Sequence, residues 1–180
     1  MFEWLREILA SLHEHLIPFV VIYEYENGGV FRLGQYHRTL GPGFHWRWPL
    51  VEAVFTEHMV VTTLALEPQT ITTKDDRTVV VGGIVRYRIC DVKDFLCEVS
   101  NQHDALRDTA MGAVLKQVRQ LELRTLLDDP PENKIASDIR RLVKPFGISI
   151  DSFTFTDAAP IRTIRLITHT YAPPPEHHYE

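Results

Sequence analysis

Two pairs of adjacent carboxylates are the groups in this sequence best suited to acid–base chemistry. They are Asp75–Asp76 and Asp128–Asp129. Paired acids can share a proton or hold a cation, but both pairs lie in short segments typical of turns. Aspartate is favoured in turns because its side chain hydrogen-bonds the nearby backbone. We therefore interpret both pairs as solvated turn residues without a catalytic role.

The histidines and cysteines are not spaced as metal ligands. His13 and His15 lie on one predicted helix, but a separation of two residues points them away from each other. Cys90 and Cys97 form neither a Cys-x-x-Cys pair nor a disulfide framework. We interpret the two cysteines as small buried thiols, and we expect no metal and no cofactor.

Two further catalytic motifs are incomplete. Gly29 and Gly34 have the glycine spacing of a phosphate-binding loop, but Gln35 and Tyr36 follow where that loop needs a lysine. The sequence contains no Gly-x-Ser-x-Gly nucleophile motif. The sequence therefore predicts a protein that is not an enzyme.

The length, composition and net charge of the chain exclude further classes of function. The 180 residues, of which 44% are hydrophobic, suit one folded domain with a short appendage. The net charge is −5, so we expect no nucleic-acid partner, because phosphate binding needs clustered lysine and arginine. No stretch reaches the roughly 20 apolar residues that a membrane-spanning helix needs.

The first 17 residues have the spacing of an amphipathic helix that ends at Pro18. Three interpretations remain open: a helix packed on its own domain, a helix lying in a membrane interface, or a helix that packs on a partner. Its polar face is acidic, whereas membrane-surface helices favour lysine and arginine. The side chains that would contact a membrane are Phe2, Trp4, Leu5, Ile8, Leu9, Leu12 and Leu16.

An aromatic segment follows the tight turn predicted at Gly41-Pro42-Gly43. Phe44, Trp46 and Trp48 alternate with polar residues over five positions. These rings either plug one end of a sheet or lie at a membrane surface, where amphipathic rings favour the headgroup level. With Phe19, they complete the predicted membrane contact.

Residues 71–91 predict a long β-hairpin arm. Lys74-Asp75-Asp76 forms its turn, and a strand begins at Thr78. Alternate residues place one apolar set on a single face. That set is Val79, Val81, Val85, Tyr87 and Ile89. Gly82-Gly83 interrupts the strand and predicts a bulge or a close backbone approach.

The segments on either side of this arm predict an α+β fold. Strands are expected over 19–25, 30–36 and 51–66, with a hairpin turn at Asn27-Gly28-Gly29. After the arm, Asp91 begins a first helix, residues 101–121 form a second, and Gly147 ends a third that begins near residue 131. Residues 148–156 return as a strand. We expect a curved antiparallel sheet with the helices packed on it.

Three motifs, in this order, resemble the SPFH or band 7 domain of stomatins, prohibitins and flotillins. The first is Gly41-Pro42-Gly43-Phe44-His45-Trp46 with Pro49. The second runs from Thr72-Thr73-Lys74-Asp75-Asp76 through the valine-rich strand to Tyr87-Arg88-Ile89-Cys90-Asp91. The third is Phe146-Gly147-Ile148, where the family usually has Trp-Gly-Ile. The resemblance extends from about Val20 to Pro160.

The resemblance implies an SPFH-like domain over 19–160. The residue pattern adds an N-terminal amphipathic helix over 1–18, an extension over 161–170 and a Pro-rich tail over 171–180. Family members usually carry an N-terminal hydrophobic membrane segment and a long C-terminal coiled coil, and neither pattern is present here. We therefore expect peripheral membrane attachment, and a monomer or at most a dimer in dilute solution.

The function that the resemblance implies is non-catalytic. We expect a scaffold on the cytoplasmic side of a membrane that organises or restrains a membrane protein complex and can self-associate on that surface. The alternative is a soluble, truncated module in the cytoplasm that co-assembles with a longer family member or interferes with it.

Overall fold

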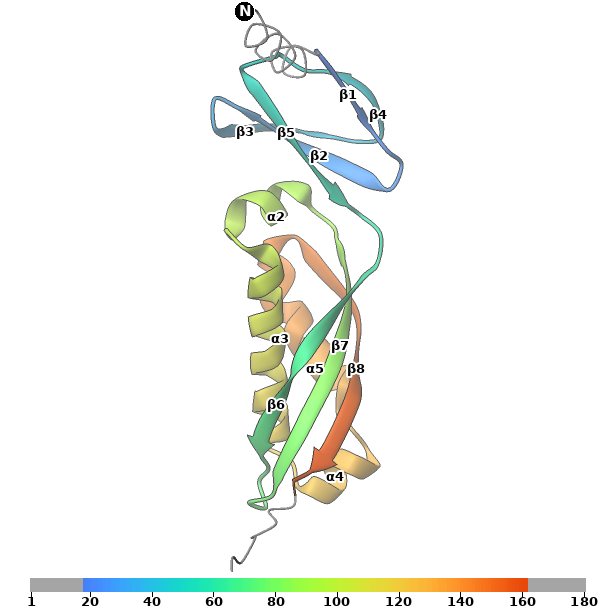
Figure 1. Ribbon diagram of the computed structural model, residues 1–180, viewed down its shortest axis with the longest axis vertical. Helices are drawn as coiled ribbons and strands as arrows, with labels where there is room; N and C mark the ends of the chain where they lie inside the picture. Colours follow the sequence, from blue (N-terminus) through green and yellow to red (C-terminus); the bar gives the residue numbers. More distant parts are fainter. Residues whose placement is uncertain (1–17, 162–180) are drawn as a thin grey trace, which may run out of the picture.

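The computed structural model describes residues 18–161, which form two lobes along one long axis (Figure 1). The upper lobe in Figure 1 contains strands only. They are β1 (Phe19–Ile22), β2 (Glu26–Arg32), β3 (Gln35–Leu40), β4 (Gly43–Trp46) and β5 (Glu52–His58). β1 pairs antiparallel with β4, and β2 lies between β3 and β5. Ile22, Val30 and Leu40 form the small core of this lobe.

The lower lobe packs helices on one face of a long antiparallel sheet. Its strands are β6 (Thr62–Thr72), β7 (Thr78–Ile89) and β8 (Ile148–Pro160), in the order β6-β7-β8. Its helices are α2 (Val92–Glu98), α3 (Gln102–Val118), α4 (Leu123–Asp128) and α5 (Glu132–Val143), followed by the 3-10 turn η1 (Lys144–Phe146). Figure 1 shows α3 and α5 lying along the sheet, α2 facing the upper lobe and α4 at the opposite end.

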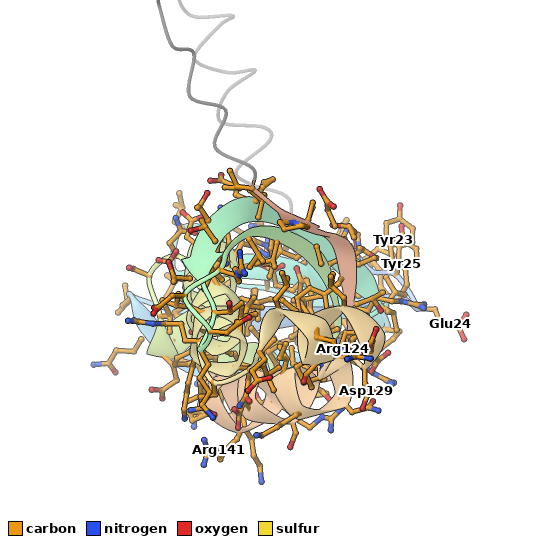
Figure 2. All side chains as sticks on the ribbon, turned by 90° about the horizontal axis from the view of Figure 1, so that it is seen from below. Tyr23, Glu24, Tyr25, Arg124, Asp129 and Arg141 are labelled. Atoms are coloured by element: carbon orange, nitrogen blue, oxygen red, sulfur yellow. The ribbon has the colours of Figure 1, made fainter. Side chains whose placement is uncertain are left out.

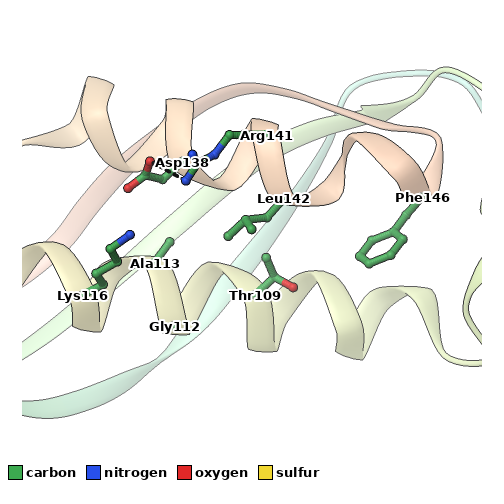
Figure 3. A pocket seen from close by; sticks show the side chains of 8 residues that line it. All are labelled: Thr109, Gly112, Ala113, Lys116, Asp138, Arg141, Leu142 and Phe146. Carbon is green, nitrogen blue, oxygen red and sulfur yellow. Dashed lines mark ion pairs between the residues drawn. The ribbon is translucent and has the colours of Figure 1, made fainter.

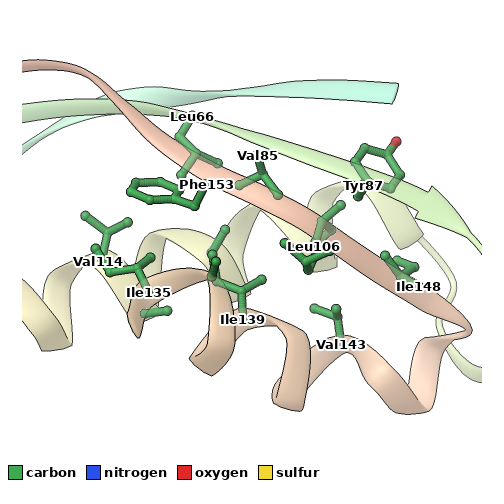
Figure 4. Packing of buried hydrophobic residues seen from close by; sticks show 14 of the residues in the cluster. Leu66, Val85, Tyr87, Leu106, Val114, Ile135, Ile139, Val143, Ile148 and Phe153 are labelled. Carbon is green, nitrogen blue, oxygen red and sulfur yellow. The ribbon is translucent and has the colours of Figure 1, made fainter. Parts of the chain in front are cut away.

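The main core lies between this sheet and α3 and α5 (Figure 4). The predicted inward face of β7 is confirmed, because the alternate residues from Val79 to Ile89 are buried. On the helices, residues three or four apart contribute Leu106, Ala110 and Val114 from α3. Ile135, Ile139 and Val143 from α5 complete the layer. This spacing is that of a helix with one apolar face.

The α+β class is confirmed, but the strands are divided among three sheets rather than forming one. The strand predicted over 51–66 is wrong, because β5 ends at His58 and β6 begins at Thr62. β5 pairs with β2 in the upper lobe, whereas β6 pairs with β7 in the lower lobe. Residues 59–61 therefore connect the two lobes.

The predicted turn at Asn27–Gly29 is also wrong, because these residues lie inside β2. The β2–β3 turn is at Leu33 and Gly34, which both have positive φ, 51° and 83°, as a tight two-residue hairpin turn requires. Gly29 instead allows α2 to pack closely against β2. A Cβ added there would lie 2.7 Å from Leu96 Cδ1 of α2, so the glycine allows the lobes to touch.

The irregularity predicted at Gly82-Gly83 is confirmed. The β7–β8 register shifts between these two residues, and the ring of Phe153 lies over Gly83, where a Cβ would be 2.7 Å from Cε2. A second register shift lies between Arg86 and Tyr87. These shifts bend the long sheet around its helices.

The helix boundaries follow the predictions with three differences. Asp91 caps α2, accepting hydrogen bonds from the backbone N–H groups of Lys93 and Asp94. The second helix ends at Val118 instead of 121, α5 ends at Val143 and is followed by η1 before Gly147, and α4 was not predicted. Cys90 and Cys97 are exposed, so their interpretation as buried thiols is wrong.

Gly112 in the middle of α3 offers a test of helix propensity. A Cβ added at Gly112 would meet nothing within 4 Å. Gly112→Ala should therefore stabilise the protein by about 1 kcal/mol, because glycine loses more backbone entropy in a helix than alanine. Thermal unfolding of the two proteins in dilute buffer measures this. An unchanged or lower midpoint would contradict the free space at this position.

Candidate functional site

One face of the β1–β4 pair exposes a continuous group of apolar side chains, which we call the aromatic surface. It consists of Phe19 and Val21 from β1, and Phe44 and Trp46 from β4. Because side chains alternate across a strand, Phe19 and Val21 share one face. The antiparallel register pairs Phe19 with Trp46 and Val21 with Phe44, which brings all four side chains to that face.

These side chains contact one another yet remain open to solvent. The ring centroids of Phe19 and Phe44 are 5.3 Å apart, and those of Phe19 and Trp46 are 6.1 Å apart. Each of the four residues is between 45% and 68% exposed. The opposite face of the same strands packs inward, with Ile22 buried in the upper core. β1 is therefore apolar on both faces, and within residues 18–161 only the face with Val20 and Ile22 packs against a core.

The loop after β4 adds further exposed apolar side chains. Trp48 is exposed and Leu50, at φ 65°, is 83% exposed. Leu33, in the β2–β3 turn, is 81% exposed, and its N–H donates to Val51 O at 3.0 Å. This bond ties the two turns together. In Figure 1, β1 and β4 lie at the end of the molecule opposite α4.

A buried carboxylate fixes the loop that carries Trp48 and Leu50. The side chain of Glu52 is fully buried and accepts two hydrogen bonds from Arg32, from Nε at 3.1 Å and from Nη2 at 2.6 Å. The N–H of Trp48 donates to its second oxygen at 3.0 Å, and Arg38 lies 3.7 Å from that oxygen. Charge-assisted bonds of this kind are the stronger ones in proteins, so they hold the loop in one conformation.

Glu52 should give the upper lobe an acid-sensitive stability. Burial alone would raise its pKa, but the bonds from Arg32 and Trp48 and the charges of Arg32 and Arg38 outweigh this and lower the pKa below its ordinary value of 4.5. A carboxyl whose pKa is lowered by folding stabilises the protein above its unfolded pKa, and this stabilisation is lost as the pH falls through the folded pKa.

Glu52→Gln should therefore destabilise the protein at neutral pH by about 1.5–3 kcal/mol, the range for hydrogen bonds to charged groups. The difference between Glu52→Gln and wild type should shrink at a pH well below 4.5. Urea unfolding at the two pH values, followed by tryptophan fluorescence, measures both effects. An equal difference in the free energy of unfolding at both pH values would show that Glu52 is not the titrating group.

The structure brings together only part of the predicted membrane contact. Phe19, Phe44, Trp46 and Trp48 are all exposed, on β1, on β4 and in the loop after β4, so they do not plug the sheet. The other predicted residues, Phe2, Trp4, Leu5, Ile8, Leu9, Leu12 and Leu16, lie outside the described residues. Val21, Leu33, Leu50 and Glu52 were not predicted. Val21 alternates with Phe19, which is the signal that could have found it.

A second exposed aromatic group lies on the side of the upper lobe. The rings of Tyr23 and Tyr25 stack at 5.6 Å, and Tyr25 also stacks on His58 at 5.4 Å. Figure 2 shows both tyrosines projecting outward beside Glu24. Unlike the aromatic surface, this group mixes rings with hydroxyl and carboxylate groups, so it is the more polar of the two.

The second sequence motif forms the β6–β7 turn and connects that turn to the helices of the lower lobe. In the predicted turn Lys74-Asp75-Asp76, the Asp75 carboxylate accepts hydrogen bonds from Thr73 Oγ1 at 2.6 Å and from the N–H of Leu123 at 3.1 Å. These bonds lower the pKa of Asp75, with the Thr73 hydroxyl as the largest cause. Lys74 N donates to Leu121 O at 2.9 Å. The turn is therefore docked on the segment between α3 and α4.

The motif residues Tyr87, Asp91 and Gly147 lie at the other end of the lower lobe. The hydroxyl of Tyr87 bonds to His103 Nδ1 of α3 at 3.0 Å. Gly147, at φ 68°, follows η1 and accepts hydrogen bonds from the N–H groups of Cys90 and Asp91. These contacts fix α2, which faces the upper lobe.

The described residues contain neither a metal-binding cluster nor a helix that could span a membrane. Within residues 18–161, no group of three or more acidic, histidine or cysteine residues could hold a metal. None of the helices in that range has the length and hydropathy needed to span a bilayer. The clearest surface feature of this range is the exposed apolar group on β1 and β4.

The sequence matches the model of the SPFH domain / Band 7 family over residues 20–166. The chain belongs to this family. The match covers both lobes, so the two-lobed arrangement of residues 18–161 is that of an SPFH domain in this chain.

Relatives of this SPFH protein occur in archaea, bacteria and animals. It is 29% identical to an uncharacterised protein of Archaeoglobus fulgidus, over 86% of this chain and 63% of that protein. It is 36% identical to Protein HflK of Vibrio cholerae, over 54% of this chain and 25% of HflK. It is 25% identical to mouse stomatin, over 76% of this chain and 50% of stomatin. The chain thus corresponds to a part of these three relatives.

Proposed function

We propose that this SPFH protein is a non-catalytic scaffold that attaches peripherally to the cytoplasmic side of a membrane and organises or restrains a membrane protein complex. Family membership supports the scaffold role, since the relatives include stomatin and HflK. The observation that supports the membrane contact is the aromatic surface at the end of the upper lobe.

The chemistry of this surface suits the interface between water and lipid. Phenylalanine and tryptophan rings are enriched at headgroup depth because their apolar faces leave water there. The nearby guanidinium groups of Arg32 and Arg38 share the single carboxylate of Glu52, so only one net positive charge remains in this cluster. Binding should therefore depend on apolar insertion and change little with salt, whereas electrostatic attraction to anionic lipid is screened by salt.

Tryptophan fluorescence in the presence of vesicles tests the proposal. The chain has three tryptophans, and Trp4→Phe leaves only Trp46 and Trp48, both exposed in the upper lobe. Neutral phosphatidylcholine vesicles should shift the emission of Trp4→Phe to shorter wavelength, and the shift should persist at high salt. Bound protein with unshifted emission would place the contact elsewhere, and protein that fails to float with the vesicles would overturn it.

A membrane partner is a separate part of the proposal. Pull-down from native membranes with the full chain should recover a membrane protein complex, and a variant with a disrupted aromatic surface should recover less of it. If the protein instead binds a longer SPFH protein in the absence of lipid, the role is that of a co-assembling module. The same pull-down without membranes separates the two.

A further inference from the structure

A groove runs between α3 and α5 on the lower lobe, on the side away from the sheet (Figure 3). It has a volume of about 420 Å³. Its floor on α3 consists of the small residues Thr109, Gly112 and Ala113, and Leu142 and Phe146 border it from α5 and η1. Leu142 is 48% exposed. Because no Cβ occupies position 112, another helix could approach α3 closely here.

The rim of this groove is cationic. Lys116 and Arg141 both line it. Asp138 also lies there, but its carboxylate accepts a hydrogen bond from Gln117 Nε2 at 2.6 Å and lies 3.6 Å from Arg141. Lys116 has no ion-pair partner within residues 18–161. A segment with one apolar face and acidic side chains beside it would complement this groove.

Residues 1–17 have these properties by sequence. Their spacing predicts a helix with an apolar stripe that includes Leu5, Leu12 and Leu16. Acidic residues outnumber basic ones in this segment, with Glu3, Glu7 and Glu14 against Arg6. Seventeen helical residues span about 25 Å, which equals the length of α3 at the same rise per residue. An acidic polar face is unusual on a membrane surface but suits a cationic rim.

The segment cannot reach the groove of its own chain. It is joined directly to Pro18, whose carbonyl accepts a hydrogen bond from Arg47 N at 2.7 Å in the upper lobe. β1 begins at the next residue, at the end of the molecule remote from the groove (Figure 1). A helix without a linker at Pro18 therefore cannot lie along α3 and α5 of the same copy.

We propose that the α3–α5 groove binds residues 1–17 of a second copy of this chain. Two copies can exchange these helices reciprocally, which gives a closed dimer with two identical contacts. The recognition is that of an amphipathic helix in an apolar groove. The proposal goes beyond the membrane attachment, because it assigns the apolar stripe a protein partner when no lipid is present.

Light scattering of the full chain in lipid-free buffer tests this. The mass should rise from 20.8 kDa toward twice that value as the concentration increases through the micromolar range. Leu142→Glu in the groove, and separately Leu5→Glu with Leu12→Glu in the segment, should each weaken self-association at least about tenfold, as expected for a central contact. Leu127→Glu in α4 is the matched control, because Leu127 is 47% exposed and does not line the groove.

The outcomes separate this proposal from the membrane proposal. Leu142→Glu should bind vesicles like wild type, because its position lies on the other lobe. A monomer at all concentrations, or a dimer that survives Leu142→Glu, would overturn the groove contact. If Leu142→Glu unfolds by circular dichroism, Gly112→Trp blocks the same groove from α3, with Gly112→Ala as its control. A dimer that survives Gly112→Trp would equally reject the proposal.

Discussion

Gly147→Ala should destabilise the protein by about 3 kcal/mol or more, through strain and steric overlap together. Gly147 has φ 68°, a conformation that costs an alanine roughly 1–2 kcal/mol. A Cβ there would also lie 2.3 Å from Asp91 O and 3.1 Å from Phe95 N. These are backbone atoms at the start of α2, so α2 must move, and overpacking of this kind costs about 1–3 kcal/mol.

The control for Gly147→Ala is Gly34→Ala. Gly34 has φ 83°, but a Cβ there would meet nothing within 4 Å, so this variant reports the backbone strain alone. Urea unfolding of both variants should show a clearly larger loss for Gly147→Ala. Equal losses would mean that α2 accommodates the added methyl group and that the contact with Asp91 does not fix its position.

Phe44→Glu with Trp46→Glu should lower vesicle binding by roughly a hundredfold. Full burial of a large apolar side chain contributes about 1.5–3 kcal/mol. Partial insertion of the two rings should contribute about half of the sum of their two burial free energies. That half is about 1.5–3 kcal/mol, and its upper end corresponds to two powers of ten in affinity. Both residues are more than half exposed, so the variant should fold normally. Flotation with phosphatidylcholine vesicles at several lipid concentrations measures the change.

Tyr23→Glu with Tyr25→Glu is the matched control for that variant. It adds the same two charges to the same lobe, at the exposed tyrosines of the lateral group. This control should float like wild type. If both double variants lose binding equally, added charge rather than the aromatic surface is responsible. If neither loses binding, the membrane contact lies outside β1 and β4.

The parts of the fold that the sequence predicts well are those with one decisive local signal. The face of β7 follows from strict alternation, because one side of that strand is covered and the other is not. The start of α2 at Asp91 and the left-handed Gly147, which ends η1 rather than α5, depend on side chains and conformations that only a few residue types supply. The position of the aromatic residues after Gly43 follows from the turn before them.

The errors arise where one residue type can serve two physical purposes. Gly29 was assigned to a turn because glycine permits positive φ, but here it permits the close approach of Leu96, 67 residues away in the chain. The segment 51–66 has strand character throughout, yet its halves pair in different lobes. That choice depends on distant partners, which local spacing does not reveal.

The geometry of the candidate site also depends on residues that are distant in the chain. Glu52 has the sequence context of a surface acid, and it is buried only because Arg32 and Arg38 approach from two other strands. Phe19, Phe44, Trp46 and Trp48 are exposed, and their contact with a membrane stays a prediction. Their gathering on one face depends on the register of β1 against β4, which pairs Phe19 with Trp46.

The length of the lower-lobe sheet determines how far from the aromatic surface a partner can bind. β7 has 12 residues, and a strand rises about 3.3 Å per residue, so the sheet extends for about 40 Å. Its far end carries the β6–β7 turn, α4 and the end of β8 (Figure 1). If the aromatic surface lies in the headgroups, as we propose, and the long axis points away from the bilayer, the lower lobe would act as a spacer. A protein bound near α4 would stand several nanometres from the lipid, and a partner that must touch the bilayer has to contact the upper lobe.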